Sequence, residues 1–161
     1  ITRDGIGVAL AASSGTGKST CCQRIPSPWR ALSDDESMIV HDTGDQYQIH
    51  PFPTWSEYLR DKNATSTWNV EEGVPLSAIF FLEQAEIDQA IPAGKGQAAV
   101  YICQIAIQVY NRMWGEAKYR EQKSHKRDLF INACKIAETI PVYILRVSLN
   151  GNFWDEIDKV L

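Results

Sequence analysis

The sequence has few cysteines, and none of them is spaced for a metal site. The 161 residues contain four cysteines and three histidines. No Cys-x-x-Cys pair occurs and the histidines are not grouped with the cysteines, so a structural zinc site is not predicted. Cys21 and Cys22 fall in an expected helix. We interpret the cysteines as small buried hydrophobic residues in a reducing cytosol.

Long apolar runs and an excess of basic residues are also missing. The longest apolar runs, "IGVALAA" and "AIFFL", are far shorter than the roughly 20 residues that span a membrane. No basic stretch followed by an apolar run opens the chain, so no secretion signal is predicted. The net charge of -4 argues against nucleic acid as the main partner. We expect a cytoplasmic protein without a membrane segment. Because Ile1 already lies in an expected strand, we also expect a missing upstream segment.

The apolar runs and amphipathic stretches that are present predict an α/β fold. Strands are expected over residues 5–13, 29–33, 37–42, 46–52, 76–84 and 142–149. A short helix is expected from Ser19 until Pro26 stops it, and further helices over residues 96–114, 121–139 and 153–161. Thr43-Gly44-Asp45 predicts a hairpin turn, which makes the sheet mixed. Residues 54–75 are expected to form a surface excursion. One domain over residues 1–161 is expected.

The stretch "AASSGTGKST", residues 11–20, matches a phosphate-binding loop except at its first glycine. The motif is Gly, four residues, and then Gly-Lys-Ser/Thr, and Ala12 occupies the first position. The glycines nearest the phosphates are present, as are a buried strand before the loop and a helix after it. Lys18 is expected to contact the outer phosphates and the Ser19 hydroxyl to hold Mg²⁺. The expected nucleotide-binding residues are Ser14, Gly15, Thr16, Gly17, Lys18, Ser19 and Thr20. No guanine-recognition signature occurs, which favours ATP.

Phosphoryl transfer also needs carboxylates, and the sequence offers two sets. Asp34 and Asp35 end the expected strand that follows the loop. Glu83 ends "AIFFLE", an apolar run plus an acid that is typical of a Walker B strand. A carboxylate positions the metal, and a second one can accept the proton of an attacking hydroxyl. His50, within the rigid stretch "HPFPTW", is either at the rim of the phosphate site or part of a core edge that buries aromatic residues.

The loop and the acidic pair together resemble the HPr kinase/phosphorylase family of phosphoenolpyruvate-carboxykinase-like proteins. The similarity lies in "SSGTGKS", a very short helix and "LSDD". More closely, "WRALSDDESMIV", "HPFPTWS" and "LSAIFFLEQAE" resemble small HPr-kinase-like proteins called SynChlorMet cassette protein C, found beside peptide-modifying genes. The resemblance implies that Lys18 binds phosphate, that Ser19 and Asp35 bind Mg²⁺, and that Asp34 and Asp35 are catalytic. It also moves Glu83 away from the Walker B role.

Three functions are compatible with these residues. The first is a kinase that uses ATP and Mg²⁺ to phosphorylate a hydroxyl, either a serine of a peptide or protein or a small molecule. The second is a non-catalytic nucleotide-binding regulator or adaptor of a peptide-modification system. The third is another phosphate-loop chemistry, either carboxykinase-like or hydrolytic. The kinase is the leading prediction, and the sequence identifies neither the acceptor nor the oligomeric state.

Overall fold

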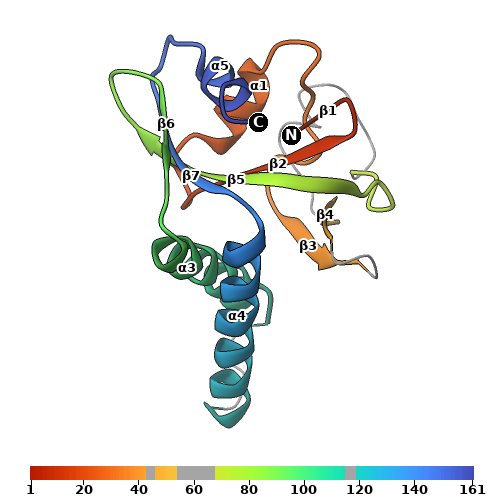
Figure 1. Cartoon of the computed structure of the whole chain (residues 1–161). Coiled ribbons are helices and arrows are strands. Elements are labelled where there is room, and N and C mark those ends of the chain that lie inside the picture. Colours follow the sequence, from red (N-terminus) through yellow and green to blue (C-terminus); the bar gives the residue numbers. More distant parts are fainter. Residues whose placement is uncertain (43–45, 54–67, 115–118) are drawn as a thin grey trace.

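In the computed structural model, which describes residues 1–42, 46–53, 68–114 and 119–161, a seven-stranded mixed sheet organises the chain (Figure 1). Its strands are β1 (Thr2–Arg3), β2 (Ile6–Ala11), β3 (Ser37–His41), β4 (Tyr47–Pro51), β5 (Val74–Gln84), β6 (Gln89–Pro92) and β7 (Val142–Val147). They run in the order β1-β2-β5-β4-β3, and β7 pairs with both β5 and β6. The predicted α/β class with a mixed sheet is therefore confirmed.

The centre of the sheet is a parallel trio in which β5 lies between β2 and β7. Leu10 pairs with Phe80, which in turn pairs with Tyr143. These strands are the continuous apolar runs of the sequence, as expected for strands that are covered on both faces. Because β2 and β5 are parallel, both carboxyl ends lie at one edge of the sheet, and the loop after β2 leaves from that edge.

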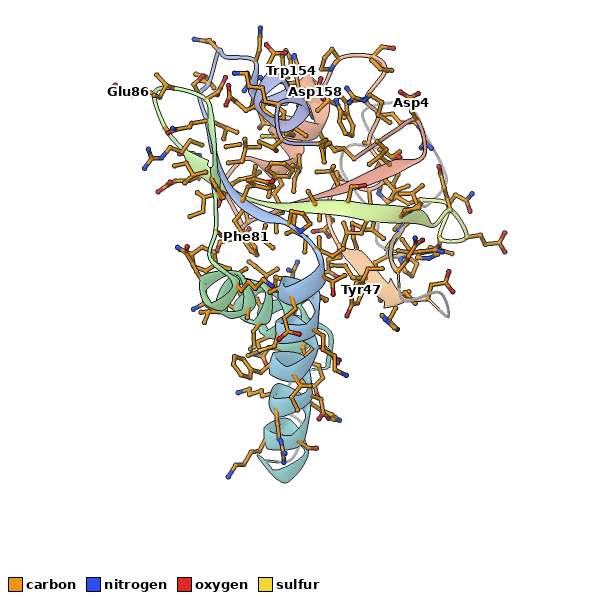
Figure 2. All side chains as sticks on the ribbon, viewed as in Figure 1. Asp4, Tyr47, Phe81, Glu86, Trp154 and Asp158 are labelled. Atoms are coloured by element: carbon orange, nitrogen blue, oxygen red, sulfur yellow. The ribbon has the colours of Figure 1, made fainter. Side chains whose placement is uncertain are left out.

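Helices cover both faces of this sheet. On one face lie α1 (Lys18–Arg24) and α5 (Phe153–Asp158), and on the other lie α3 (Lys95–Trp114) and α4 (Tyr119–Thr139). Successive residues of β5 point to opposite faces. Phe80 packs in the cluster that contains Phe153, whereas Phe81 makes a tilted ring contact with Tyr101 of α3, with 5.2 Å between the ring centroids. Figure 2 shows Phe81 on the α3 side of the sheet and Trp154 with α5 on the opposite side.

The helix α4 extends well beyond the sheet and lies alongside α3 (Figure 1). Its buried side chains are those nearest the sheet, at Ala133, Ile136 and Ala137, while residues 123–128 are all exposed. We call α3 and α4 together the helical arm. No helix in the described ranges is both long and apolar enough to cross a bilayer.

The predicted hairpin is confirmed as the antiparallel pair β3–β4, with Ile39 opposite Ile49. β4 joins the main sheet through only two residues, Gln48 and Ile49, at the start of β5. The predicted turn residues 43–45 lie outside the described residues. So does most of the predicted surface excursion, residues 54–67.

The strand predicted over residues 29–33 is wrong. Arg30 forms a single bridge to Thr2, with two backbone hydrogen bonds of 2.9 and 3.0 Å, and no longer ladder follows. The short strand β1, for which the sequence analysis gave no bounds although it expected a strand at Ile1, already occupies the edge of β2 at Ile6 and Gly7. Trp29 is instead a buried core residue whose Nε1 donates to Asp158 at 3.1 Å. The strand β6 was missed, because only four residues form it.

Candidate functional site

The loop between β2 and α1 takes its shape from two glycines. Gly15 and Gly17 have φ angles of 81° and 110°, in the left-handed region that residues with a Cβ rarely adopt. Ala12 does not require that region, since Asp4 alone among the described non-glycine residues has a positive φ. Alanine at the first position of the motif is therefore compatible with this loop conformation.

Lys18, the first residue of α1, folds its side chain back over the loop. Its Nζ donates to the carbonyl oxygens of Ala12 at 3.0 Å and of Ser13 at 3.3 Å. These contacts hold a positive charge beside backbone that can approach an anion closely, and charge-assisted hydrogen bonds to phosphate oxygens are strong. Ser19 and Thr20 follow at exposed positions in the first turn of α1. The loop end of the site is thus basic and open.

The acidic segment, residues 33–36, begins with a turn that a serine side chain closes. Ser33 Oγ donates to the Glu36 carbonyl oxygen at 3.3 Å. Asp34 is only 7% exposed, and its Oδ1 has no hydrogen-bond partner among the described residues. Asp35, in contrast, is exposed. Since a buried carboxylate oxygen without a partner is costly, Asp34 is a position where a cation or a ligand hydroxyl would be stabilised.

A cavity of about 860 Å³ joins the loop to the acidic segment. Its lining includes Ser14, Lys18, Asp34 and Asp35, many apolar side chains of the sheet and the helical arm, and the polar side chains Gln108, Arg112 and Asn132 of that arm. Small-molecule sites commonly measure roughly 300–1,000 Å³, so the volume suits a ligand of nucleotide size. The structure therefore brings four predicted site residues to one cavity. The remaining predicted loop residues are not part of its lining: Gly15, Thr16, Gly17, Ser19 and Thr20.

Two charged residues of the site were missed by the sequence analysis. Glu36 is buried at 7% exposure and forms an ion pair with Arg112 of α3, with Nη1 and Oε1 3.3 Å apart. The same nitrogen lies 4.0 Å from Asp35 Oδ1. The pairing joins residues 76 positions apart (112 minus 36), so no local sequence pattern signals it. Arg112 thus connects the acidic segment to the helical arm.

Glu83 lies at the carboxyl end of β5 but not in the large cavity. Its Oε2 is 3.3 Å from Nε of Arg146 on β7, and the Glu83 side chain is 56% exposed. It lines a smaller cavity of about 270 Å³, whose lining also includes Thr16 of the loop. The neighbouring Gln84 donates from Nε2 to the Thr16 carbonyl oxygen at 3.2 Å. The end of β5 therefore supports the loop, a role that sequence analysis did not assign.

His50 lies at the opposite end of β5 from the loop. It follows Ile49, which pairs with Val74 at the start of β5, whereas the loop follows Ala11, which pairs with Phe81. Phe81 is seven positions beyond Val74 along the strand (81 minus 74), or about 23 Å at the usual rise. The placement does not support a position for His50 at the rim of the phosphate site.

The cysteines do not form a reactive site. Cys21, Cys22 and Cys103 are buried and Cys134 is half-buried, all four as free thiols. Burial raises the pKa of Cys21 to about 11 and also raises the pKa of Cys22. Since the thiolate is the reactive form, these side chains act as small hydrophobic residues of the core. The Cys22 thiol lies 3.9 Å from the Ser33 carbonyl oxygen, and so helps to hold the acidic segment against α1.

Magnesium needs few protein ligands, because it usually keeps several waters and binds the substrate phosphates as well. The described residues contain no group of three or more His, Cys, Asp and Glu side chains that could hold a metal by themselves. The unpartnered Oδ1 of Asp34 and the exposed carboxylate of Asp35 could supply oxygens to a Mg²⁺ ion that arrives with a nucleotide. The Ser19 hydroxyl is a further oxygen at the start of α1.

Comparisons with known proteins assign the chain to one family. Neither curated proteins nor solved structures give a match. The family described as SynChlorMet cassette protein ScmC matches residues 1–161, which is the whole chain. Because the match covers its full length, the chain belongs to the SynChlorMet cassette protein ScmC family.

Proposed function

We propose that this chain is an ATP-binding, Mg²⁺-dependent kinase that transfers phosphate to a hydroxyl group. The observation that carries the proposal is that Lys18 of the loop lines one cavity with Asp34, whose buried Oδ1 has no hydrogen-bond partner among the described residues. A cation for the phosphates and a base for the acceptor are the two groups that phosphoryl transfer requires. The resemblance of "SSGTGKS" and "LSDD" to HPr kinase supports the same assignment. The proposal includes a cytoplasmic location, where ATP is available.

Each residue then has a separate role. Lys18 binds the outer phosphates of ATP, and Asp34 accepts the proton of the acceptor hydroxyl. As the hydroxyl oxygen bonds to the γ-phosphorus, the bond from that phosphorus to the bridging oxygen breaks and ADP leaves. A bound Mg²⁺, held by Ser19 and Asp35, would neutralise the charge on the phosphates. Positioning of the acceptor provides much of the rate in such reactions.

A second function, a nucleotide-binding regulator without catalysis, is favoured by one observation. Arg112 already pairs with Glu36 and lies near Asp35, so part of the acidic segment is engaged with the helical arm. In a regulator, nucleotide binding would alter this pairing, and no phosphate would be transferred. The two functions differ in whether Asp34 is needed for product formation.

The test is incubation of the purified chain with Mg²⁺-ATP and serine-containing peptides, followed by mass spectrometry of the peptides. ATP binding is measured in parallel by titration calorimetry. A kinase phosphorylates a peptide in the parent and not in Asp34→Asn, while both bind ATP. Tight ATP binding with no phosphorylated product would favour the regulator. Absence of ATP binding would refute both functions.

A further inference from the structure

The apolar part of the large cavity lies between the edge strand β3 and the helical arm. Ile39 of β3, Ile105 and Val109 of α3 and Leu129 and Ile136 of α4 all line it. Figure 1 shows the β3–β4 hairpin on the same side of the sheet as α3 and α4. These side chains are half-buried or buried, and the apolar surface that they leave toward the cavity can take up apolar groups of a second ligand beside a nucleotide held at Lys18.

The edge of β3 offers backbone hydrogen bonds beside that wall. Among the described residues β3 pairs only with β4, and it ends the strand order of the sheet. Two backbone hydrogen bonds show which residues of β3 bond to β4. They run from the Phe52 N–H to the Glu36 carbonyl oxygen and from the Asp42 N–H to the Gln46 carbonyl oxygen, and in an antiparallel ladder every second residue is bonded in this way. By that alternation, residues 38 and 40 bond to β4, and the N–H and C=O groups of Ser37 and Ile39 point outward. An extended peptide can bind to such an edge as an added strand.

The edge also leads directly to the acidic segment. β3 begins at Ser37, immediately after Glu36, and Ser37 lines the same cavity as Asp34 and Lys18. A peptide paired with the start of β3 would therefore have a residue beside the carboxylate of Asp34. Alternate side chains of that peptide would point toward the apolar wall of the helical arm. Backbone pairing and side-chain burial thus favour a peptide over a small molecule.

We propose that the β3 edge and the apolar wall form the acceptor site, and that the acceptor is an extended peptide segment with a serine or threonine flanked by large apolar side chains. This inference rests on the proposed kinase function for the transfer step, in which the hydroxyl proton passes to Asp34 and ADP leaves. The peptide-binding step itself is independent of nucleotide. The two parts can therefore be tested separately.

The binding test uses two fluorescently labelled peptides and the whole chain without nucleotide. One peptide has a central serine with isoleucine and valine on both sides, and the other has glycine and asparagine in their place. Both carry the same terminal lysines for solubility. Fluorescence anisotropy should show binding of the apolar peptide at least about tenfold tighter, because only its side chains bury apolar surface against the wall. Equal affinity for the two peptides, or no binding of either, would overturn the inference.

Two variants of α3 locate the site. Val109→Asp places a charge in the apolar wall and should weaken binding of the apolar peptide about tenfold or more. Val100→Asp changes an α3 residue that is 45% exposed and outside the cavity lining, and it should bind as the parent does. Circular dichroism of both variants checks that the fold is retained. If Val109→Asp does not fold, Val109→Thr, which keeps the shape and removes apolar character, replaces it.

Methylation of alternate backbone nitrogens in the apolar peptide tests strand pairing. Methyl groups on the nitrogens that face β3 remove donors of the ladder and should abolish binding, whereas methyl groups on the other nitrogens should not. Equal effects of the two sets would show that the peptide is not bound as a strand. A concentration-dependent dimer of the parent that excludes the peptide would assign the edge to a second copy of the chain and overturn the inference.

Phosphorylation separates this inference from the proposed function. With Mg²⁺-ATP added, the serine of the apolar peptide should be phosphorylated and the glycine-asparagine peptide should not. Peptide binding without ATP binding would refute the kinase and leave the peptide site intact. ATP binding and phosphorylation of both peptides at equal rates would support the kinase and refute this acceptor site.

Discussion

The loop over residues 12–18 and the acidic segment over residues 33–36 border the same cavity but are held in place in different ways. The loop is shaped mainly by local features, the positive φ angles of Gly15 and Gly17 and the bonds of Lys18 to carbonyl groups six and five positions earlier, with one distant contact from Gln84 to the Thr16 carbonyl oxygen. The acidic segment depends on distant parts of the chain, chiefly on Arg112 of the helical arm. Substitutions in the loop should therefore act locally, and substitutions around the acidic segment should also report on the helical arm.

The largest expected effect is on the rate of phosphate transfer, when a residue of the acidic segment is substituted. Asp34→Asn removes the proposed base and should lower the rate of phosphate transfer by roughly 10²–10⁴-fold, while ATP affinity stays close to that of the parent. Single-turnover assays with Mg²⁺-ATP and calorimetry measure the two quantities. The matched control is Glu83→Gln, which changes an exposed carboxylate paired with Arg146 and should do much less. Loss of turnover in Glu83→Gln alone would assign the Walker B role to Glu83.

The second largest expected effect is on the affinity for ATP, when Lys18 of the loop is substituted. Lys18→Ala removes a charge-assisted contact to phosphate and should weaken ATP binding by about 1.5–3 kcal/mol. The fold should persist, because the Lys18 side chain contacts only carbonyl groups of its own loop among the hydrogen bonds described. Calorimetry gives the affinity and thermal melting the stability. Unchanged ATP affinity in this variant would contradict the phosphate-loop assignment.

Two substitutions compare a loop residue that needs a positive φ with a loop residue that does not. Gly17→Ala places a Cβ at a φ of 110° and should destabilise the fold or the loop by about 1–2 kcal/mol. Ala12→Gly changes a residue that does not need a positive φ, and its cost should stay below about 1 kcal/mol. Urea unfolding and ATP affinity measure both variants. A strong gain of ATP affinity in Ala12→Gly would show that alanine at the first motif position limits nucleotide binding.

The smallest expected effect is on the free energy of unfolding, when each of two ion pairs is broken. Arg112→Ala leaves the buried carboxylate of Glu36 without its partner and should lower the free energy of unfolding by about 1–2 kcal/mol. Arg146→Ala breaks an exposed pair with Glu83 and should cost less than about 0.5 kcal/mol. Chemical denaturation of both variants checks the order. Equal costs would mean that the helical arm does not stabilise the acidic segment.

The sequence predicts most of the fold because its central strands are apolar on both faces. The runs that form β2, β5 and β7, and the helical spacing that forms α3 and α4, depend on local pattern alone. The prediction failed at "WRALS", where strand formation depended on a free neighbouring edge that β1 occupies instead. Lys18, Asp34 and Asp35, which line the large cavity, were predicted as site residues from motif, spacing and the resemblance to HPr kinase. Glu36 and Arg112 were not, because their pairing exists only when the helical arm packs beside the acidic segment.

The arrangement of the helical arm has a consequence for hydrogen exchange. Beyond its buried residues near the sheet, α4 packs on α3, and residues 123–128 are exposed. Few buried contacts support this far part, so its amides should open by local fraying at a lower free energy than the amides of β5. The Leu129–Ile140 portion, anchored by Ala133 and Ile136, should open with the sheet. Deuterium would therefore enter α4 from its amino end, and the boundary of protection would mark where the domain core stops.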